Sequence, residues 1–173
     1  MANTFEAIAT VTVPGGGTAN ITFSSIPQTY TDLCLFISAR SEAAGNFSDE
    51  LIKLNNTTSS YTNRYIYGNG ANALVGSNAY SGSGGFSGGL PGDTATASTF
   101  GNKMIYIPNY AGSNNKAYSV DGAAERNATT AYLHLLAGLR SNTDAVTSIV
   151  LVTDSGADYA QHTTATLYGI KNS

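Results

Sequence analysis

Two short stretches of the chain match glycine-containing motifs of enzymes. Gly85-Phe86-Ser87-Gly88-Gly89 fits G-x-S-x-G, in which a serine on a sharp turn between a strand and a helix is the nucleophile of a hydrolase. Leu90-Pro91-Gly92 follows at once and cannot begin a long helix, so the context that would expose Ser87 is missing. Gly68-Asn69-Gly70-Ala71-Asn72-Ala73 loosely fits a dinucleotide-binding motif, but no helix is predicted after it to bind a pyrophosphate. Neither match predicts a catalytic serine or a bound cofactor.

The residue types that ligate metals or transfer protons are few and dispersed. His134 lies in an apolar segment, which predicts a buried, hydrogen-bonded structural histidine, whereas His162 lies near a predicted turn and is expected at the surface. Asp154 and Asp158 offer two carboxylates, fewer than the six to eight oxygens that a calcium ion takes. The single cysteine, Cys34, forms neither an intramolecular disulfide nor a zinc cluster, and between two leucines it is predicted to be a buried, inert thiol. We expect no metal, no cofactor and no enzymatic activity.

Tyrosine is the most frequent aromatic residue, with 11 copies against 6 Phe and no Trp. Its ring supplies rigid apolar area with a polar tip, which suits protein interfaces and stacking on sugars. Packing at sheet margins is the commoner role of tyrosine in all-β proteins, and the absence of Trp weakens a sugar-stacking platform. Subunit contact is therefore the functional use that we expect. The candidate partner-contact residues are Tyr65, Tyr67, Leu74, Val75, Tyr80 and Phe86.

The composition determines the fold class that must position these residues. The chain of 173 residues holds 21 Thr, 18 Ser, 16 Asn and 19 Gly, but only 4 Glu, 4 Lys, 4 Arg and 2 Gln. The abundant types favour strands, caps and turns, while the scarce ones normally cover exposed helix faces. A hydrophobic fraction of 42% and a net charge of −3 exclude a disordered chain. The sequence predicts one all-β domain over residues 1–173.

The charge balance excludes several classes of partner. Eight basic residues against 11 acidic ones, with the basic residues scattered singly, provide no patch that would neutralise phosphates. Nucleic acid and anionic membranes are therefore not expected as partners. No apolar run approaches the ~18 residues of a membrane span. Residues 1–6 have neither a charged region nor an apolar run, so no signal peptide is expected there.

Strand patterns recur along the chain at intervals of about 8–12 residues, which is typical of a sandwich or barrel. The predicted strands are 5–13, 20–23, 33–37, 51–54, 64–67, 103–107, 117–123, 132–139, 148–152 and 165–170. The first two are expected to form a hairpin across the glycine-bearing turn at 14–17. A helix competes over 132–139, but Gly138 and the preceding threonines favour a strand. Apolar strand positions predict a core of Phe23, Leu33, Leu35, Ile37, Ile105, Leu133, Leu135, Val150, Val152 and Leu167.

Residues 68–98 interrupt this regular pattern. The segment carries nine glycines together with many Asn and Ser residues, which predicts one long loop. Loops of this length are uncommon in compact domains and are usually functional or disordered. The segment also holds apolar residues, among them Leu74, Val75 and Phe86, which a flexible linker does not need. It is either an excursion that orders against a partner or a long solvent loop.

Three stretches, taken in order, resemble a family of proteins. They are residues 9–13 with 21–23 after the glycine turn, then 25–33 (Ser-Ile-Pro-Gln-Thr-Tyr-Thr-Asp-Leu), and 164–171 (Thr-Ala-Thr-Leu-Tyr-Gly-Ile-Lys) at the end. This order resembles a group of small tailed-bacteriophage virion proteins, and residues 65–70 fit the same pattern. The resemblance implies a jelly-roll-like antiparallel β-sandwich, no catalysis, and a place on the capsid surface or in the tail fibres. It transfers no binding residue to this chain.

Within that family two roles remain open. A tail fibre needs an attachment segment and a shaft, and strand pattern from about Phe5 to Ile170 leaves no room for them. We therefore expect a capsid decoration (cement) protein that bridges major capsid protein subunits on the virion exterior, made in the host cytoplasm. The alternative is a tail-fibre or tail-tip module for attachment to host-surface glycans. Closed symmetry is the rule for such assemblies, and a homotrimer is the expected oligomer.

Overall fold

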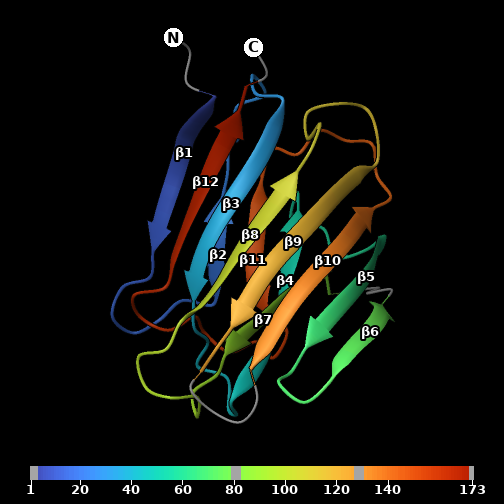
Figure 1. The fold of residues 1–173 in the computed structure, drawn as a ribbon. Coiled ribbons are helices and arrows are strands. Elements are labelled where there is room, and N and C mark those ends of the chain that lie inside the picture. Colours follow the sequence, from blue (N-terminus) through green and yellow to red (C-terminus); the bar gives the residue numbers. More distant parts are fainter. Residues whose placement is uncertain (1–3, 79–82, 127–130, 172–173) are drawn as a thin grey trace.

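The computed structural model describes residues 4–78, 83–126 and 131–171. Within these ranges the chain forms twelve β-strands and no helix, arranged as two antiparallel sheets packed face to face (Figure 1). The all-β antiparallel sandwich predicted from the composition is confirmed. Residues 132–139, where a helix competed, form a strand as expected.

The larger sheet has eight strands and forms the front layer in Figure 1. Their order across the sheet is β1 (Phe5–Thr12), β12 (Thr164–Ile170), β3 (Asp32–Ala39), β8 (Gly101–Ile107), β9 (Lys116–Ala124), β10 (Tyr132–Arg140), β5 (Tyr61–Gly68) and β6 (Ala73–Asn78). Side chains alternate between its two faces, as the pleat requires. In β9, for example, Tyr118 and Val120 are buried against the second sheet while Ser119 and Asp121 are exposed.

The smaller sheet has four strands and lies behind the larger one. Its order is β2 (Asn20–Phe23), β11 (Ile149–Thr153), β4 (Phe47–Leu54) and β7 (Gly85–Pro91). Strand β7, at the edge of the smaller sheet, packs beneath β9 and β10 and reaches β5. This difference in width leaves β5 and β6 as an overhanging flank.

The core lies between the two sheets and is built from inward-facing aliphatic side chains. The buried residues include Phe23, Leu33, Leu35, Ile37, Ile52, Leu54, Ile105, Ile107, Val120, Ile149, Leu151 and Leu167. Of the predicted core, Phe23, Leu33, Leu35, Ile37, Ile105 and Leu167 are confirmed there. Cys34 is also buried, and burial raises the pKa of its thiol.

Three of the predicted core residues were assigned to the wrong face. Leu133 and Leu135 are exposed on the outer face of the larger sheet, because β10 turns His134 and Leu136 inward instead. Val152 is only partly buried, since β11 turns Ile149 and Leu151 toward the core. Val150 is buried, but it does not belong to the central cluster.

The predicted hairpin over residues 5–23 is also wrong. Strand β1 pairs with β12 in the larger sheet, whereas β2 pairs with β11 in the smaller one. The turn between them contains Gly16 and Gly17, both with positive φ, so the chain crosses from one sheet to the other there. Strand β2 thereby buries Ile21 and Phe23 in the core, whereas β1, at the edge of the larger sheet, stays largely exposed.

The glycine-rich segment 68–98 is not one long loop, because it contains β6 and β7. Its glycines give aromatic rings room to lie against the strand backbone. A Cβ atom on Gly85 would stand 2.3 Å from the Tyr118 hydroxyl oxygen, and one on Gly89 would stand 1.7 Å from the Phe47 ring. Aromatic residues that cover strand glycines in this way pin the pairing of the sheet. Much of the tyrosine content therefore serves the packing of the sandwich.

Candidate functional site

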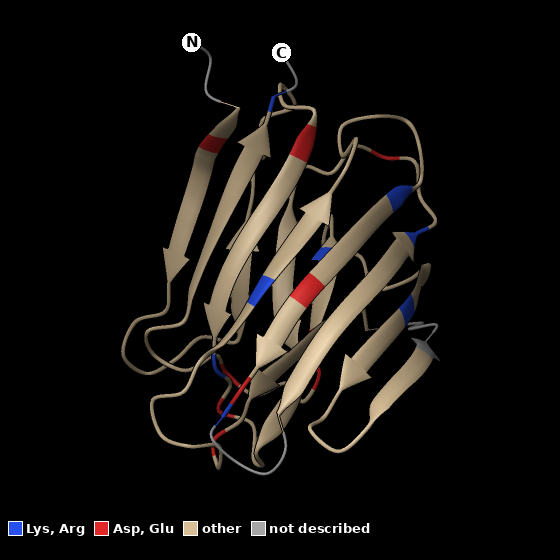
Figure 2. Ribbon diagram, viewed as in Figure 1, with Lys and Arg blue, Asp and Glu red and all other residues tan. Residues whose placement is uncertain are grey.

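A single row of side chains crosses the outer face of the larger sheet, with one residue from each strand. The registers of the seven strand pairs align Thr10, Thr166, Phe36, Met104, Asp121, Leu135, Ile66 and Val75 in that order. We call this set the outer row. Charged residues are sparse on the strands of this sheet (Figure 2).

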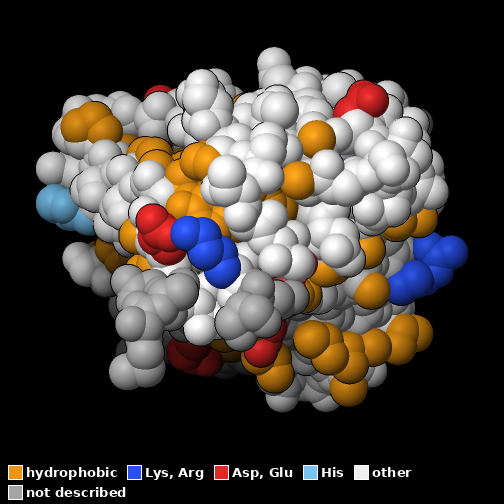
Figure 3. All heavy atoms as spheres, turned by 90° about the horizontal axis from the view of Figure 1, so that it is seen from above, with side chains coloured by type: hydrophobic (Ala, Val, Ile, Leu, Met, Phe, Trp, Pro, Cys, Tyr) orange, Lys and Arg blue, Asp and Glu red, His pale blue; other side chains and the backbone are white. Residues whose placement is uncertain are grey.

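The outer row ends in an apolar patch on β10, β5 and β6, made of Leu133, Leu135, Ile66 and Val75. Their exposed fractions are 61%, 56%, 53% and 81%, respectively. Beside the patch an open groove of about 820 Å³ is lined partly by Ile66, Val75 and Leu135, with Arg64 at its side. Seen from above, hydrophobic side chains gather along the lower margin, on the side of the larger sheet (Figure 3). Large exposed apolar patches of this kind mark interaction sites.

A second feature lies between the sheets, on the flank that β5 and β6 overhang. Four strands contribute side chains to a cavity of about 170 Å³. Its lining, which we call the aromatic cleft, consists of Phe47 and Asp49 from β4, Tyr65 and Tyr67 from β5, Phe86 from β7, and Tyr132 and His134 from β10. Phe86 and His134 are buried, while the other five are half-buried and form its walls.

Several rings of the aromatic cleft are nearly parallel. The Tyr132 and His134 rings are inclined by 15° with centroids 5.9 Å apart, and Tyr67 stacks on His134 at the same distance with 22° between the planes. Phe47 lies 4.0 Å from Tyr132, centroid to centroid, and Phe86 meets Tyr65 edge-on at 5.2 Å. The cleft is thus lined by aromatic rings that contact one another.

The aromatic cleft contains two titratable groups, the imidazole of His134 and the carboxylate of Asp49. Burial, and secondarily the charge of Lys103, lowers the pKa of His134 to about 4, so the ring is neutral at pH 7. Burial and then the charge of Asp154 raise the pKa of Asp49, while Lys103 opposes this rise. Among the described residues, no hydrogen bond reaches the Asp49 carboxylate.

The serine of the G-x-S-x-G match lies in neither surface. Ser87 is fully buried in the middle of β7, not on a turn into a helix, and its hydroxyl donates to Glu50 Oε2 at 2.9 Å. Lys103 Nζ lies 2.9 Å from the same carboxylate oxygen, and the Tyr159 hydroxyl donates to Oε1 at 2.9 Å. Glu50 is completely buried, and these three partners compensate for the loss of water around its carboxylate. This buried network joins the sheets and does not expose a nucleophile.

The structure divides the predicted partner-contact residues between the two surfaces. Tyr65, Tyr67 and Phe86 meet in the aromatic cleft, and Val75 lies in the apolar patch. Leu74 is paired with Tyr67 at the sheet edge and is partly exposed, while Tyr80 lies outside the described residues.

Four residues of the cleft escaped prediction as site residues, namely Phe47, Asp49, Tyr132 and His134. Their signal in the sequence is a spacing of two, which puts both members of a pair on one strand face. Tyr65 and Tyr67 have the same spacing. The predicted exposure of His162 is confirmed.

Comparisons of the chain with protein-family models, with curated proteins and with solved structures find no match. In the described part of the chain no group of three or more His, Cys, Asp or Glu side chains is placed to hold a metal ion. The same residues contain no helix that is long and apolar enough to cross a membrane.

Proposed function

We propose that this chain is a non-enzymatic structural protein of a tailed-bacteriophage virion, which decorates the capsid exterior and bridges subunits of the major capsid protein. The observation that carries a docking role is the apolar patch, where four large aliphatic side chains are each more than half exposed. The phage setting rests on the resemblance of residues 9–13, 21–23, 25–33, 65–70 and 164–171 to small virion proteins.

The surroundings of the apolar patch support a protein as the partner. The patch is bordered by Thr62 and Arg64 on β5 and by Ser119 and Asp121 on β9, all of them exposed. An apolar centre with a polar rim is the usual anatomy of a protein interface. With one basic and one acidic residue in that rim, the surface suits an apolar patch on a capsid subunit and does not suit a polyphosphate.

The experiment that tests the docking role uses capsid shells and purified protein. Leu135→Asp and Val75→Asp each place a charge in the patch, and we expect each to weaken co-sedimentation with shells by at least about tenfold, since burying an unpaired charge costs several kcal/mol. Thr22→Asp, at an exposed position on β2 of the other sheet, is the matched control and should bind as the wild type does. Binding that withstands high salt is expected as well, because few charges take part. Unchanged binding by both patch variants would contradict the proposal.

The number of copies per virion separates the two virion roles. Quantitative mass spectrometry of purified virions should find hundreds of copies of a cement protein. A few tens or fewer would favour the alternative, a tail-fibre or tail-tip module that attaches to host glycans. Sedimentation of the free protein at micromolar concentration tests the proposed homotrimer directly.

A further inference from the structure

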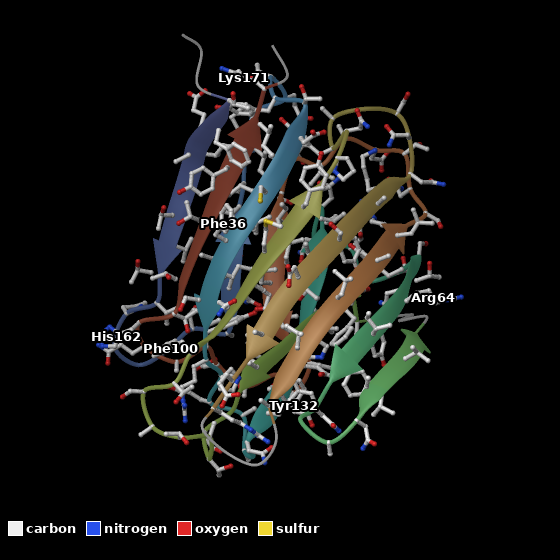
Figure 4. All side chains as sticks on the ribbon, viewed as in Figure 1. Phe36, Arg64, Phe100, Tyr132, His162 and Lys171 are labelled. Carbon is white, nitrogen blue, oxygen red and sulfur yellow. The ribbon has the colours of Figure 1, made fainter. Side chains whose placement is uncertain are left out.

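The aromatic cleft has a geometry that packing of the sandwich does not require. It keeps a volume of about 170 Å³, partly open to solvent, among five aromatic side chains, of which four are only half-buried. Tyr132 lies at the lower end of the sandwich in the view of Figure 4, where β10 begins. The volume is below the roughly 300 Å³ at which sites for drug-sized ligands begin, so the cleft fits a compact chemical group.

The charges around the cleft favour a cation as its occupant. Asp49 supplies a carboxylate that lacks a hydrogen bond among the described residues, and Asp154 adds a second negative charge nearby. Two basic side chains lie near the cleft, and both have partners in the protein. Lys103 is paired with Glu50 at 2.9 Å, and Arg126, beside Tyr132, donates to the backbone oxygen of Asn46 at 2.7 Å. His134 is neutral at pH 7 and adds no positive charge.

The walls of the cleft favour the same occupant. The face of an aromatic ring carries negative electrostatic potential and attracts cations, most strongly where water is excluded. Tyr132 already makes one cation–π contact of this kind, because the guanidinium carbon of Arg126 lies 5.9 Å from the centroid of its ring.

We propose that the aromatic cleft is a binding site for an organic ammonium group, with Phe47, Tyr65, Tyr67 and Tyr132 as its walls and Asp49 as its counter-ion. A quaternary ammonium such as that of choline is the ligand class that this combination suits best, because it needs π faces and a negative charge but no hydrogen-bond acceptors directed at it. This inference is independent of the proposed virion role.

A sugar and an anion are less suited to the cleft. A sugar ring needs several hydrogen-bonding groups around an aromatic platform, and an anion would meet the unpaired charge of Asp49. The small volume also leaves little room for a pyranose ring and the waters that would bridge it.

Choline is the probe that tests the site, and its neutral isostere 3,3-dimethylbutan-1-ol is the matched ligand. We expect choline to bind the purified wild-type protein in titration calorimetry with a Kd of about 1 mM or below, corresponding to roughly −4 kcal/mol. Saturation-transfer NMR should show contact between the N-methyl protons and aromatic protons of the protein. The neutral isostere should bind at least about tenfold more weakly, because it lacks the charge.

Variants locate the site. Asp49→Asn keeps the shape but removes the charge and should weaken choline binding by about tenfold or more. Two control variants change the outer face instead. Asp121→Asn removes an exposed carboxylate and Phe36→Leu removes an exposed aromatic ring, and both should leave choline binding unchanged. Phe47→Leu should also weaken binding, with circular dichroism to confirm that the sandwich remains folded after the loss of its contact with Gly89.

The proposal is overturned by any of three results. The first is the absence of choline binding at concentrations well above 1 mM. The second is equal binding of choline and its neutral isostere, or a methyl glycoside that binds more tightly than both. The third is unchanged affinity in a folded Asp49→Asn protein.

Discussion

Asp49 and Glu50 are adjacent carboxylates in β4, yet the molecule treats them in opposite ways. Glu50 is fully buried and is held by Lys103, Ser87 and Tyr159, each at 2.9 Å. Asp49 is half-buried at the aromatic cleft, and its carboxylate accepts no hydrogen bond among the described residues. A buried carboxylate with a complete set of partners serves the fold, whereas a desolvated carboxylate without partners is a cost that a ligand can offset.

The first way to break this comparison is to remove Glu50. Glu50→Ala leaves the ammonium of Lys103 buried without a counter-ion, and we expect a loss of about 3–5 kcal/mol in the free energy of unfolding. Urea denaturation followed by circular dichroism measures this loss, with exposed Glu42→Ala as a control that should change stability by less than about 0.5 kcal/mol.

A double variant sharpens the same test. Glu50→Leu combined with Lys103→Met removes both charges and should be far less damaging than Glu50→Ala, because no charge is then left unpaired. A loss of less than about 1 kcal/mol in Glu50→Ala would show that the network is not structural. It would also remove the contrast with Asp49.

His134 connects the aromatic cleft with the buried Glu50 network, since it lines the cleft and the charge of Lys103 acts on it. Its folded-state pKa of about 4 is below the unfolded value of about 6.5, so the unfolded chain binds the proton more readily. The stabilising effect of the neutral ring is therefore complete above pH 6.5 and is lost as the pH falls toward 4. The loss amounts to an order of 3 kcal/mol by pH 4.

The control for His134 is a variant with a ring that does not titrate. His134→Phe should lack this part of the pH dependence, so its free energy of unfolding should fall less than that of the wild type between pH 6.5 and 4. His162→Phe, at the surface, should follow the wild-type curve. Parallel curves for the wild type and His134→Phe would contradict the assignment.

The strands could be predicted from the sequence because most alternate cleanly between apolar and polar residues. The prediction of which side chains turn toward the core was wrong where both faces of a strand are apolar. In β10 the exposed Leu133 and Leu135 alternate with the buried His134 and Leu136, so hydrophobicity alone selects the wrong set. In β11 four apolar residues follow one another and give no alternation. Only the partner strands decide which face turns inward.

The prediction of one long loop over residues 68–98 was wrong for a different reason. Glycine usually indicates a turn or a flexible loop, and here Gly85 and Gly89 serve as strand residues beneath aromatic rings that are distant in sequence. Tyr118 covers Gly85, and it also covers Gly138 on β10. Such pairs depend on three-dimensional contacts, which a single sequence does not reveal.

The candidate surfaces were only partly predictable. The interface properties of tyrosine predict Tyr65 and Tyr67 as contact residues, and the apolar side chains within the glycine-rich segment predict Val75 and Phe86. The sequence does not show that three of them converge with Tyr132 and Asp49 while Val75 faces the opposite side of the sheet. The division follows from the register of β5 and β6, where Tyr67 pairs with Leu74 and Ile66 with Val75.

Asp49→Asn tests the other half of the comparison and has the smallest expected effect. Burial raises the pKa of Asp49, so above its folded-state pKa the charged form costs stability, and this cost disappears as the pH falls toward the unfolded value. Asparagine carries no charge, so the variant should be at least as stable as the wild type at pH 7, and this advantage should vanish at pH 3. Thermal unfolding at the two pH values, without added ligand, measures the difference. A clear loss of stability at pH 7 would mean that Asp49, like Glu50, has a structural partner, and the carboxylate would then not be free to pair with a ligand.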